Sequence, residues 1–177
     1  VVLLLDPRAA GVTLTAMKTS SYEPQSLLVL DNVLVPATDV LAGPQHGAEV
    51  MRIVTEHMTV ALCAHQLGVT DTLLRQTAAY TSARKQFGAP IATFQAVGNR
   101  PADRFIDVEC LRLTTYQAAS LLASGTPASV EVDIAKIWAG DVGHRASYTA
   151  QRLHGGAGVD RGNAPWRYCL GARHNEL

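Results

Sequence analysis

The sequence predicts an α+β protein in which the end of a small antiparallel β domain, residues 1–43, precedes an antiparallel helical bundle, residues 44–177. Two observations support this. The first 42 or so residues carry short β-rich runs, VVLLL, VTLTAM and SLLVLDNVLV, separated by turn-forming residues. After Gly43-Pro44 this texture gives way to long segments with apolar residues three or four positions apart, the spacing of amphipathic helices.

The composition limits the class of protein and its partners. The chain has 177 residues, of which 47% are hydrophobic, so it can build a packed core. Fifteen basic residues balance fifteen acidic ones, which favours neither nucleic acid nor an anionic membrane as a partner. The opening VVLLL is too short to span a membrane and lacks the basic start of a signal peptide. We interpret it as a buried strand, and the missing initial methionine suggests part of a longer functional unit.

The cysteines and histidines suggest neither a disulfide framework nor a metal site. Cys63, Cys110 and Cys169 are widely spaced and form no C-x-x-C pair, which favours a reducing, cytoplasmic setting. The six histidines show neither H-E-x-x-H spacing nor a cysteine partner at zinc-ligand spacing. We therefore expect no metal.

The first helix should bury a stripe of apolar residues in the core, and Gly68 inside it should mark a close approach of another helix or a ligand. Its stripe is formed by Val50, Val54, Met58, Leu62, Leu67 and Leu74. A second helix should begin near Thr93, with a bend or a late start at Pro101. Its apolar face carries Ile106, Cys110 and Leu113.

The third helix should begin at Thr126-Pro127, because threonine caps helices and proline favours the first helical position. Its apolar face carries Val130, Ile134, Ile137 and Trp138. It should end at His154-Gly155-Gly156, since glycine adopts the left-handed conformation that closes a helix. A short fourth helix should follow Pro165, completing an antiparallel bundle.

The most informative segment is RKQFGAPIATFQ, residues 84–95, which places cations, an aromatic ring and amides around a helix-terminating loop. An arginine offers a planar fork of donors that suits a diphosphate, and glutamine amides can pair with the edge of a base or a flavin. The alternative is a basic helix end that complements the helix dipole, with Phe87 and Phe94 in the core.

The order of these residues closely resembles the R-x-x-F-G-x-P-I-x-x-F-Q signature of the acyl-CoA dehydrogenase family, with Ala102-Asp103 at that family's next Ala-Asp pair. QRLHGGAG, residues 151–158, is similar to the family's glycine motif, and LLVLDNVLVPATDVLAG resembles its β-domain exit. The resemblance thus covers nearly the whole chain. Because these glycines follow a helix and have the wrong spacing for G-x-G-x-x-G, they do not indicate a Rossmann fold.

The resemblance implies FAD-dependent α,β-dehydrogenation of an acyl-CoA thioester, with electrons passing to an electron-transfer flavoprotein. It also implies that FAD lies across a subunit interface of a homo- or hetero-oligomer, as in a dimer of dimers. Carried over to this sequence, Arg84 would contact the FAD diphosphate and Gln95 the adenine side. The residues implied to bind FAD are Arg84, Gln86, Phe87, Gln95, Gln151, Arg152, Leu153, His154, Gly155 and Gly156.

No catalytic base is assigned. The reaction needs a glutamate to remove the α-proton, and in most members it would fall about two positions beyond Leu177. A minority place it on the first helix, at a position held here by Met58, with Glu56 two residues away on another face. Glu176 would need a shift in register. These departures resemble the half-site subunits of heteromeric dehydrogenases that act on bulky steroid side-chain CoA esters.

Two alternatives to a self-sufficient dehydrogenase subunit therefore stay open. The first is a catalytically silent partner that completes the FAD site of an active subunit. The second is a flavin oxidase or monooxygenase of the same fold, because oxygen reactivity depends on pocket access that these residues do not disclose.

Overall fold

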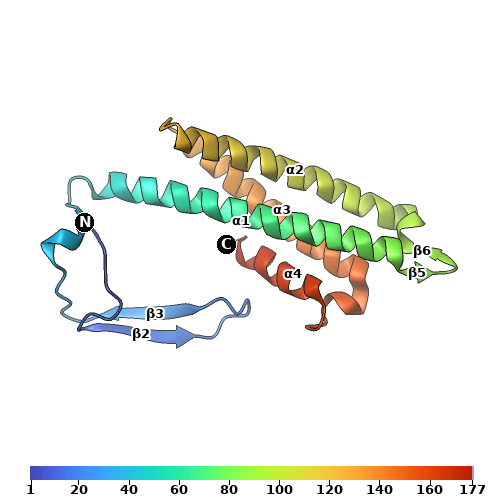
Figure 1. Cartoon of the computed structure of the whole chain (residues 1–177), viewed down its shortest axis with the longest axis horizontal. Coiled ribbons are helices and arrows are strands. Elements are labelled where there is room, and N and C mark those ends of the chain that lie inside the picture. Colours follow the sequence, from blue (N-terminus) through green and yellow to red (C-terminus); the bar gives the residue numbers. More distant parts are fainter. Residues whose placement is uncertain (177) are drawn as a thin grey trace. The chain divides into compact units, whose positions relative to one another are not determined.

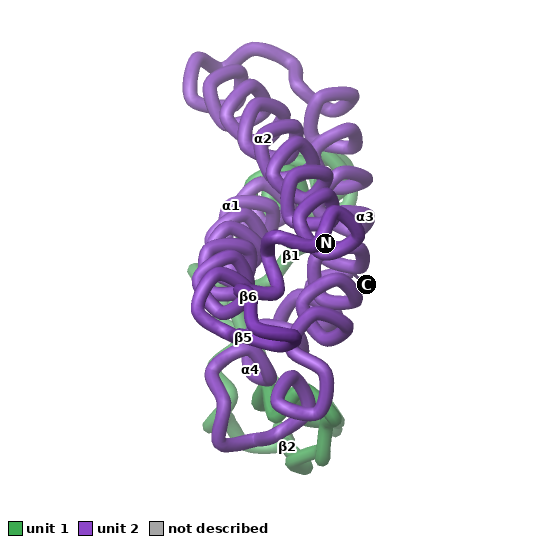
Figure 2. The backbone as a smooth tube through the Cα atoms, turned by 90° about the vertical axis from the view of Figure 1, so that its right-hand side faces the viewer, with its two compact units in different colours: residues 1–57 green, residues 58–177 purple. Residues whose placement is uncertain are grey.

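The computed structural model describes residues 1–176 and has the α+β architecture that the sequence predicts (Figure 1). It divides into two compact units, Val1–His57 and Met58–Leu177 (Figure 2). The division falls within the longest helix, so a domain boundary at residues 43 and 44 remains a prediction. The helices of the described residues are α1 (Gly47–Ala83), α2 (Gln95–Ala123), α3 (Ser129–His154) and α4 (Ala164–His174).

The first unit contains two pairs of antiparallel strands. Strands β2 (Val12–Met17) and β3 (Gln25–Leu30) form a regular hairpin, and β1 (Val2–Leu3) pairs irregularly with β4 (Val40–Ala42). The prediction that VVLLL is a buried strand is wrong, because the strand covers only two residues and Leu3 and Leu4 are exposed. β3 is exposed along its whole length within this unit.

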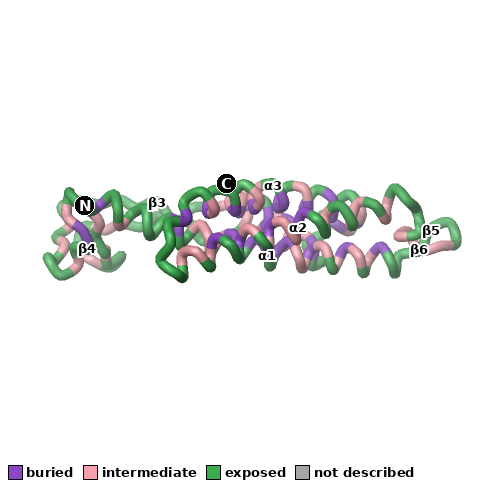
Figure 3. The backbone as a smooth tube through the Cα atoms, turned by 90° about the horizontal axis from the view of Figure 1, so that it is seen from above, coloured by how far each residue is buried: buried purple, intermediate pink, exposed green. Residues whose placement is uncertain are grey.

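The core of the second unit is built from small side chains on α3. Ala135, Ala139 and Val142 are fully buried against Cys63 of α1 and Leu111 of α2. Residues three and four apart share one face of a helix, and small residues there allow the neighbouring helices to approach closely. Figure 3 shows buried positions recurring along these helices.

Several predicted core positions lie instead on the surface of the described chain. Met58 is 68% exposed, and most residues of the apolar faces predicted for α2 and α3 also point outward, except the partly buried Cys110 and Trp138. These residues do have helical spacing, but α2 and α3 each carry a second apolar side, and that side packs in the core. The exposed residues are Val54, Met58, Ile106, Leu113, Val130, Ile134 and Ile137.

The predicted start of the second helix near Thr93 is confirmed, because α2 begins at Gln95, and Pro101 causes no late start. The predicted start of the third helix at Thr126-Pro127 is wrong, because α3 begins at Ser129. Thr126 does not cap α3. Its amide donates to the Leu121 carbonyl at 2.9 Å, and the amide of Gly125, at φ +70°, donates to Leu122. These bonds form a Schellman motif that closes α2.

The two remaining predictions about helix ends are confirmed. α3 ends at His154, and Gly155 follows with φ +60° and ψ −137°. α4 begins at Ala164, with Pro165 in its first turn, where proline removes no helical hydrogen bond.

A buried glutamine joins three of the helices. Gln66 of α1 is 0% exposed, and its Nε2 donates to the carbonyls of Ala139 in α3 at 3.1 Å and Ala172 in α4 at 2.9 Å. Its Oε1 accepts a hydrogen bond from Asn175 Nδ2 at 2.9 Å. The Ala172 carbonyl lies in the last turn of α4, where no later helical amide can reach it. Gln66 therefore satisfies an otherwise unpaired helix end.

Gly143 provides the space for this side chain. A Cβ at position 143 would lie 3.0 Å from Gln66 Cδ and 2.8 Å from the Ala172 carbonyl oxygen. Gly68 is different, because a Cβ there meets nothing within 4 Å. The expectation that another helix of the described chain packs closely against Gly68 is therefore wrong.

These two glycines make a matched pair of tests. Gly143→Ala should lower the free energy of unfolding by about 3 kcal/mol, because it overpacks the core and disturbs hydrogen bonds to a buried amide. Gly68→Ala should raise it by about 0.5–1 kcal/mol through helix propensity alone. Urea denaturation followed by circular dichroism measures both. Equal effects of the two substitutions would contradict the role assigned to Gly143.

Candidate functional site

The first candidate motif forms a tight hairpin at the end of α1. Strands β5 (Lys85–Gln86) and β6 (Ala89–Pro90) are antiparallel and joined by Phe87 at φ +53° and Gly88 at φ +81°. Two central residues with positive φ define a type I′ turn, which favours asparagine or glycine over a bulky side chain. Phe87 thus holds a strained position at the tip of the hairpin.

The side chains of this motif face outward. Phe87 is 95% exposed and meets Phe94 edge to face, with ring centroids 6.2 Å apart. The alternative that places both rings in the core is therefore wrong. Arg84, Gln86 and Gln95 are exposed as well, and Arg84 forms no ion pair with any of residues 1–176. The unpaired guanidinium of Arg84 and the amides of Gln86 and Gln95 are thus exposed around the hairpin, although Gln86 Nε2 donates to the Lys85 carbonyl at 2.8 Å.

The second motif forms the end of α3 and the 3₁₀ turn Gly155–Gly158. Gly155 and Gly156 are exposed, and a Cβ at either position would meet nothing within 4 Å. Backbone without side chains can be approached closely by a bound group, although the Gly155 amide itself donates to the Gln151 carbonyl. At Gly158, in contrast, a Cβ would lie 3.1 Å from the Cβ of His154, so the turn folds back over that residue.

The residues around these glycines differ in accessibility. Gln151 and Arg152 are exposed, and Arg152 NH1 donates to the Tyr148 hydroxyl at 3.0 Å. Leu153 is half-buried. His154 is only 7% exposed, with Nδ1 2.9 Å from the Ala150 carbonyl oxygen. Among the implied FAD residues on α3, His154 is therefore the one whose side chain is buried in the bundle.

The structure brings the two motifs together at one end of the bundle (Figure 1). The ring of Tyr80, in the last turn of α1, stacks on the His154 ring with centroids 4.3 Å apart and an interplanar angle of 23°. Sequence reasoning did not single out Tyr80, because its spacing from Arg84 fits any helical core residue. Beside the stack lies an apolar groove of about 350 Å³, lined in part by Gln76, Ala79, Asn163 and Pro165.

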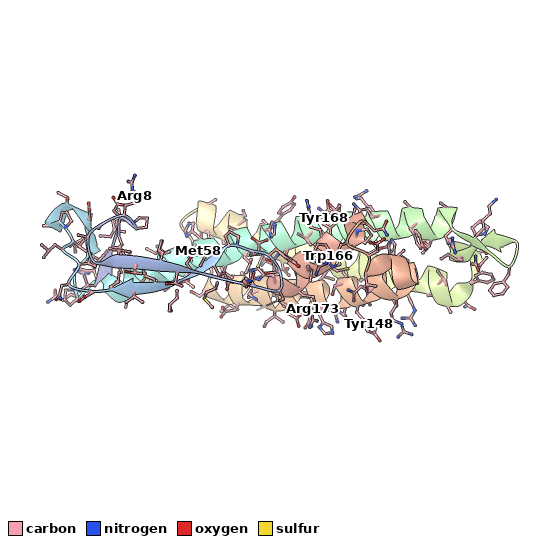
Figure 4. All side chains as sticks on the ribbon, turned by 90° about the horizontal axis from the view of Figure 1, so that it is seen from below. Arg8, Met58, Tyr148, Trp166, Tyr168 and Arg173 are labelled. Carbon is pink, nitrogen blue, oxygen red and sulfur yellow. The ribbon has the colours of Figure 1, made fainter. Side chains whose placement is uncertain are left out.

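None of the candidate bases within residues 1–176 has a free carboxylate. Glu56 is buried and accepts two hydrogen bonds from Arg52 NH1, at 2.8 and 2.9 Å. Glu176 lies 2.9 Å from Arg173 and 3.2 Å from His144. Met58, which carries no ionisable group, lies exposed on α1 (Figure 4). A carboxylate held by cations is a poor acceptor for a substrate proton, so the catalytic residue stays unassigned.

Two further observations describe the chain as a whole. No helix within residues 1–176 is both long enough and apolar enough to cross a membrane. Cys63, Cys110 and Cys169 are free thiols, and burial raises the pKa of Cys169 to about 11.

Comparison with known proteins places these motifs in one family. Residues 45–177 match the family model described as acyl-CoA dehydrogenase, C-terminal domain. The acyl-CoA dehydrogenase FadE27 of Mycobacterium tuberculosis is 38% identical over 175 residues, which cover 94% of this chain and 46% of FadE27. The chain therefore spans about half the length of this relative.

Solved structures agree with the sequence comparison. The ChsE4-ChsE5 complex from Mycobacterium tuberculosis contains a chain with a TM-score of 0.90 and 38% identity, covering 98% of this chain and 46% of that one. A variant of the Tcur3481-Tcur3483 steroid ACAD gives a TM-score of 0.87 and 34% identity, with 98% and 46% covered. Similarity in sequence, fold and motif order shows that this chain belongs to the acyl-CoA dehydrogenase family and contains its C-terminal helical domain.

Proposed function

We propose that the chain is the C-terminal part of a subunit that carries out FAD-dependent α,β-dehydrogenation of an acyl-CoA thioester within an oligomer. The observation that carries the proposal is that the Arg84 hairpin and the Gly155–Gly158 turn lie at the same end of the bundle (Figure 1), where Tyr80 of α1 stacks on His154 of α3. Family membership supplies the reaction class. The steroid ACAD among the similar structures supports a bulky acyl group as the substrate.

The residues present fit a dinucleotide. The exposed guanidinium of Arg84 suits the diphosphate, and the amides of Gln86 and Gln95 suit the adenine side. Phe87 offers an exposed ring for stacking. When bound, FAD supplies a hydride acceptor for the β-carbon of the substrate. The second motif would hold it through Gln151, Arg152, Leu153, the backbone of Gly155 and Gly156, and the peptide group of His154, whose ring is buried.

The outward apolar faces of α2 and α3 support assembly. Ile106, Leu113, Val130 and Ile137 are all exposed in the single chain. Large apolar side chains exposed at helical spacing on two helices favour an interface, because a partner can remove them from water. We propose that a second subunit covers these faces and that FAD is shared between subunits. Electrons would then pass to an electron-transfer flavoprotein, in a reducing cytoplasmic setting that free cysteines suit.

A second function, that of a silent partner subunit, is favoured by the carboxylates. Met58 occupies the position of the alternative base, and Glu56 and Glu176 are both tied to cations. The similar structure described as the ChsE4-ChsE5 complex is an assembly of two different proteins. In a heteromer of that kind, this chain would complete the FAD site while its partner supplies the base.

Anaerobic titration of the full-length protein with acyl-CoA esters separates the two functions. If the subunit carries its own base, bound flavin should bleach when substrate is added to the protein alone. If it is a silent partner, the flavin should stay oxidised until the partner subunit is added. The visible absorption spectrum reports both outcomes, and absence of flavin from every assembly would refute both.

Removing the guanidinium of Arg84 should weaken FAD binding specifically. In the full-length assembly, Arg84→Ala should raise the Kd for FAD about 10- to 100-fold, because a hydrogen bond to a charged group contributes about 1.5–3 kcal/mol. The matched control is Arg75→Ala, which removes an exposed arginine of α1 that is paired with Asp71. Equal affinity of the two variants, measured by flavin fluorescence, would contradict the assignment.

Replacing the strained turn residue Phe87 should change the free energy of unfolding and the affinity for FAD in opposite directions. Phe87→Asn relieves a positive-φ position that costs about 1–3 kcal/mol and loses an aromatic contact that contributes about 0.5–1.5 kcal/mol. We therefore expect the free energy of unfolding to rise by about 1 kcal/mol while FAD affinity falls. Urea denaturation and FAD titration test the two effects. Loss of stability together with unchanged affinity would contradict both the strain and the binding role assigned to Phe87.

A further inference from the structure

We infer that Tyr80 is a positioning residue that holds the two FAD-binding motifs in register, and that His154 acts through its contact with Tyr80 rather than through its ring touching FAD. This inference rests on the proposed function, since it concerns how the proposed FAD site is kept in shape. It assigns roles to one residue that no motif contains and to one whose ring is buried.

Tyr80 is connected to the arginine hairpin through the backbone. Its carbonyl accepts the amide hydrogen of Arg84 at 2.8 Å, which extends the helical hydrogen-bond pattern of α1 by one residue. The Arg84 carbonyl in turn accepts the amide of Ile91 at 2.8 Å, on the far side of the hairpin. The position of the Tyr80 turn therefore sets where the hairpin leaves the helix.

Tyr80 is connected to the glycine turn through its ring. The centroid distance of 4.3 Å and the interplanar angle of 23° describe a stacked aromatic pair. The second ring belongs to His154, whose Nδ1 lies 2.9 Å from the Ala150 carbonyl oxygen of the same helix. Gly158 packs onto the Cβ of His154, so a shift of His154 would shift the whole turn Gly155–Gly158.

The surroundings of the stack leave its two rings little further support at the end of the bundle. The groove of about 350 Å³ lies directly beside the two rings, so loss of the Tyr80 ring would enlarge an existing opening. On the other side of the turn, Asn163 Nδ2 donates to the Ala157 carbonyl at 3.1 Å, an exposed bond that fixes only the later part of the turn. Packing of Leu73 against Ala146 and Ala150 fixes the preceding turns of α1 and α3, so the aromatic pair is the contact that aligns their last turns, from which the two motifs extend.

The test measures FAD affinity in the full-length protein with any partner subunit it requires. Tyr80→Leu keeps apolar bulk and helix propensity but removes the planar ring, and should raise the Kd for FAD about five- to tenfold, the scale of one aromatic pair. Tyr80→Phe keeps the ring and should restore the affinity of the unmodified protein. The visible circular dichroism of bound flavin should change in Tyr80→Leu only.

Leu111→Ala provides the control for stability. Leu111 is a fully buried core residue of α2 and lines neither motif, and the substitution should cost about 2–5 kcal/mol. If Leu111→Ala lowers the melting temperature of the apoprotein at least as much as Tyr80→Leu but leaves FAD affinity intact, a positioning role is supported. If FAD affinity follows melting temperature across these variants, Tyr80 is only structural and the inference fails.

A double-mutant cycle tests the role of His154. Tyr80→Leu, His154→Leu and the double variant should each weaken FAD binding to a similar extent, because the second substitution removes a contact already lost. Multiplicative losses would show that His154 acts independently of Tyr80 and would overturn the inference. If the unmodified protein binds no FAD, the proposed function fails; if all variants bind as tightly as the unmodified protein, only the present inference fails.

Discussion

The hydrogen bonds of Gln66 are the constraint on which the helical unit depends. One side chain amide joins α1 to the middle of α3 and to the last turn of α4, and it accepts a further bond from Asn175. A buried polar group is tolerated only when its donors and acceptors are paired. Because these partners come from separate helices, Gln66 is satisfied in one arrangement of the bundle, and Gly143 keeps the space that this arrangement needs.

That arrangement determines where the two motifs lie. α1 ends in the arginine hairpin and α3 ends in the glycine turn, so fixing α1 against α3 brings both to the same end of the bundle. The small residues Ala135 and Ala139 allow the close approach that this needs. Local features then shape the two motifs. Positive φ at Phe87 and Gly88 forms the tight turn of the hairpin, and Gly155, which has no side chain, leaves the backbone after α3 accessible.

The packing of the helices and the pairing of the carboxylates both favour a chain that works as part of an assembly. Small side chains such as Ala135 and Ala139 fill the inner side of α3, while large apolar residues such as Ile106 and Leu113 of α2 lie on the outside. The carboxylates near the expected base positions, Glu56 and Glu176, are paired with Arg52 and Arg173. Both features are consistent with a site that is completed by residues from elsewhere in a larger assembly.

The sequence by itself determined the fold class, the existence of the long helices, the end of α3 and the family, because these follow from local periodicity and from ordered motifs at fixed spacing. Only the tertiary structure decided which apolar face packs inside: Ile106 and Val130 have the same spacing as buried residues but lie outside. It also decided the role of Thr126, whose amide closes α2, and the pairing of Tyr80 with His154. These features depend on contacts between residues far apart in the chain, and no local pattern records which residue a side chain will meet.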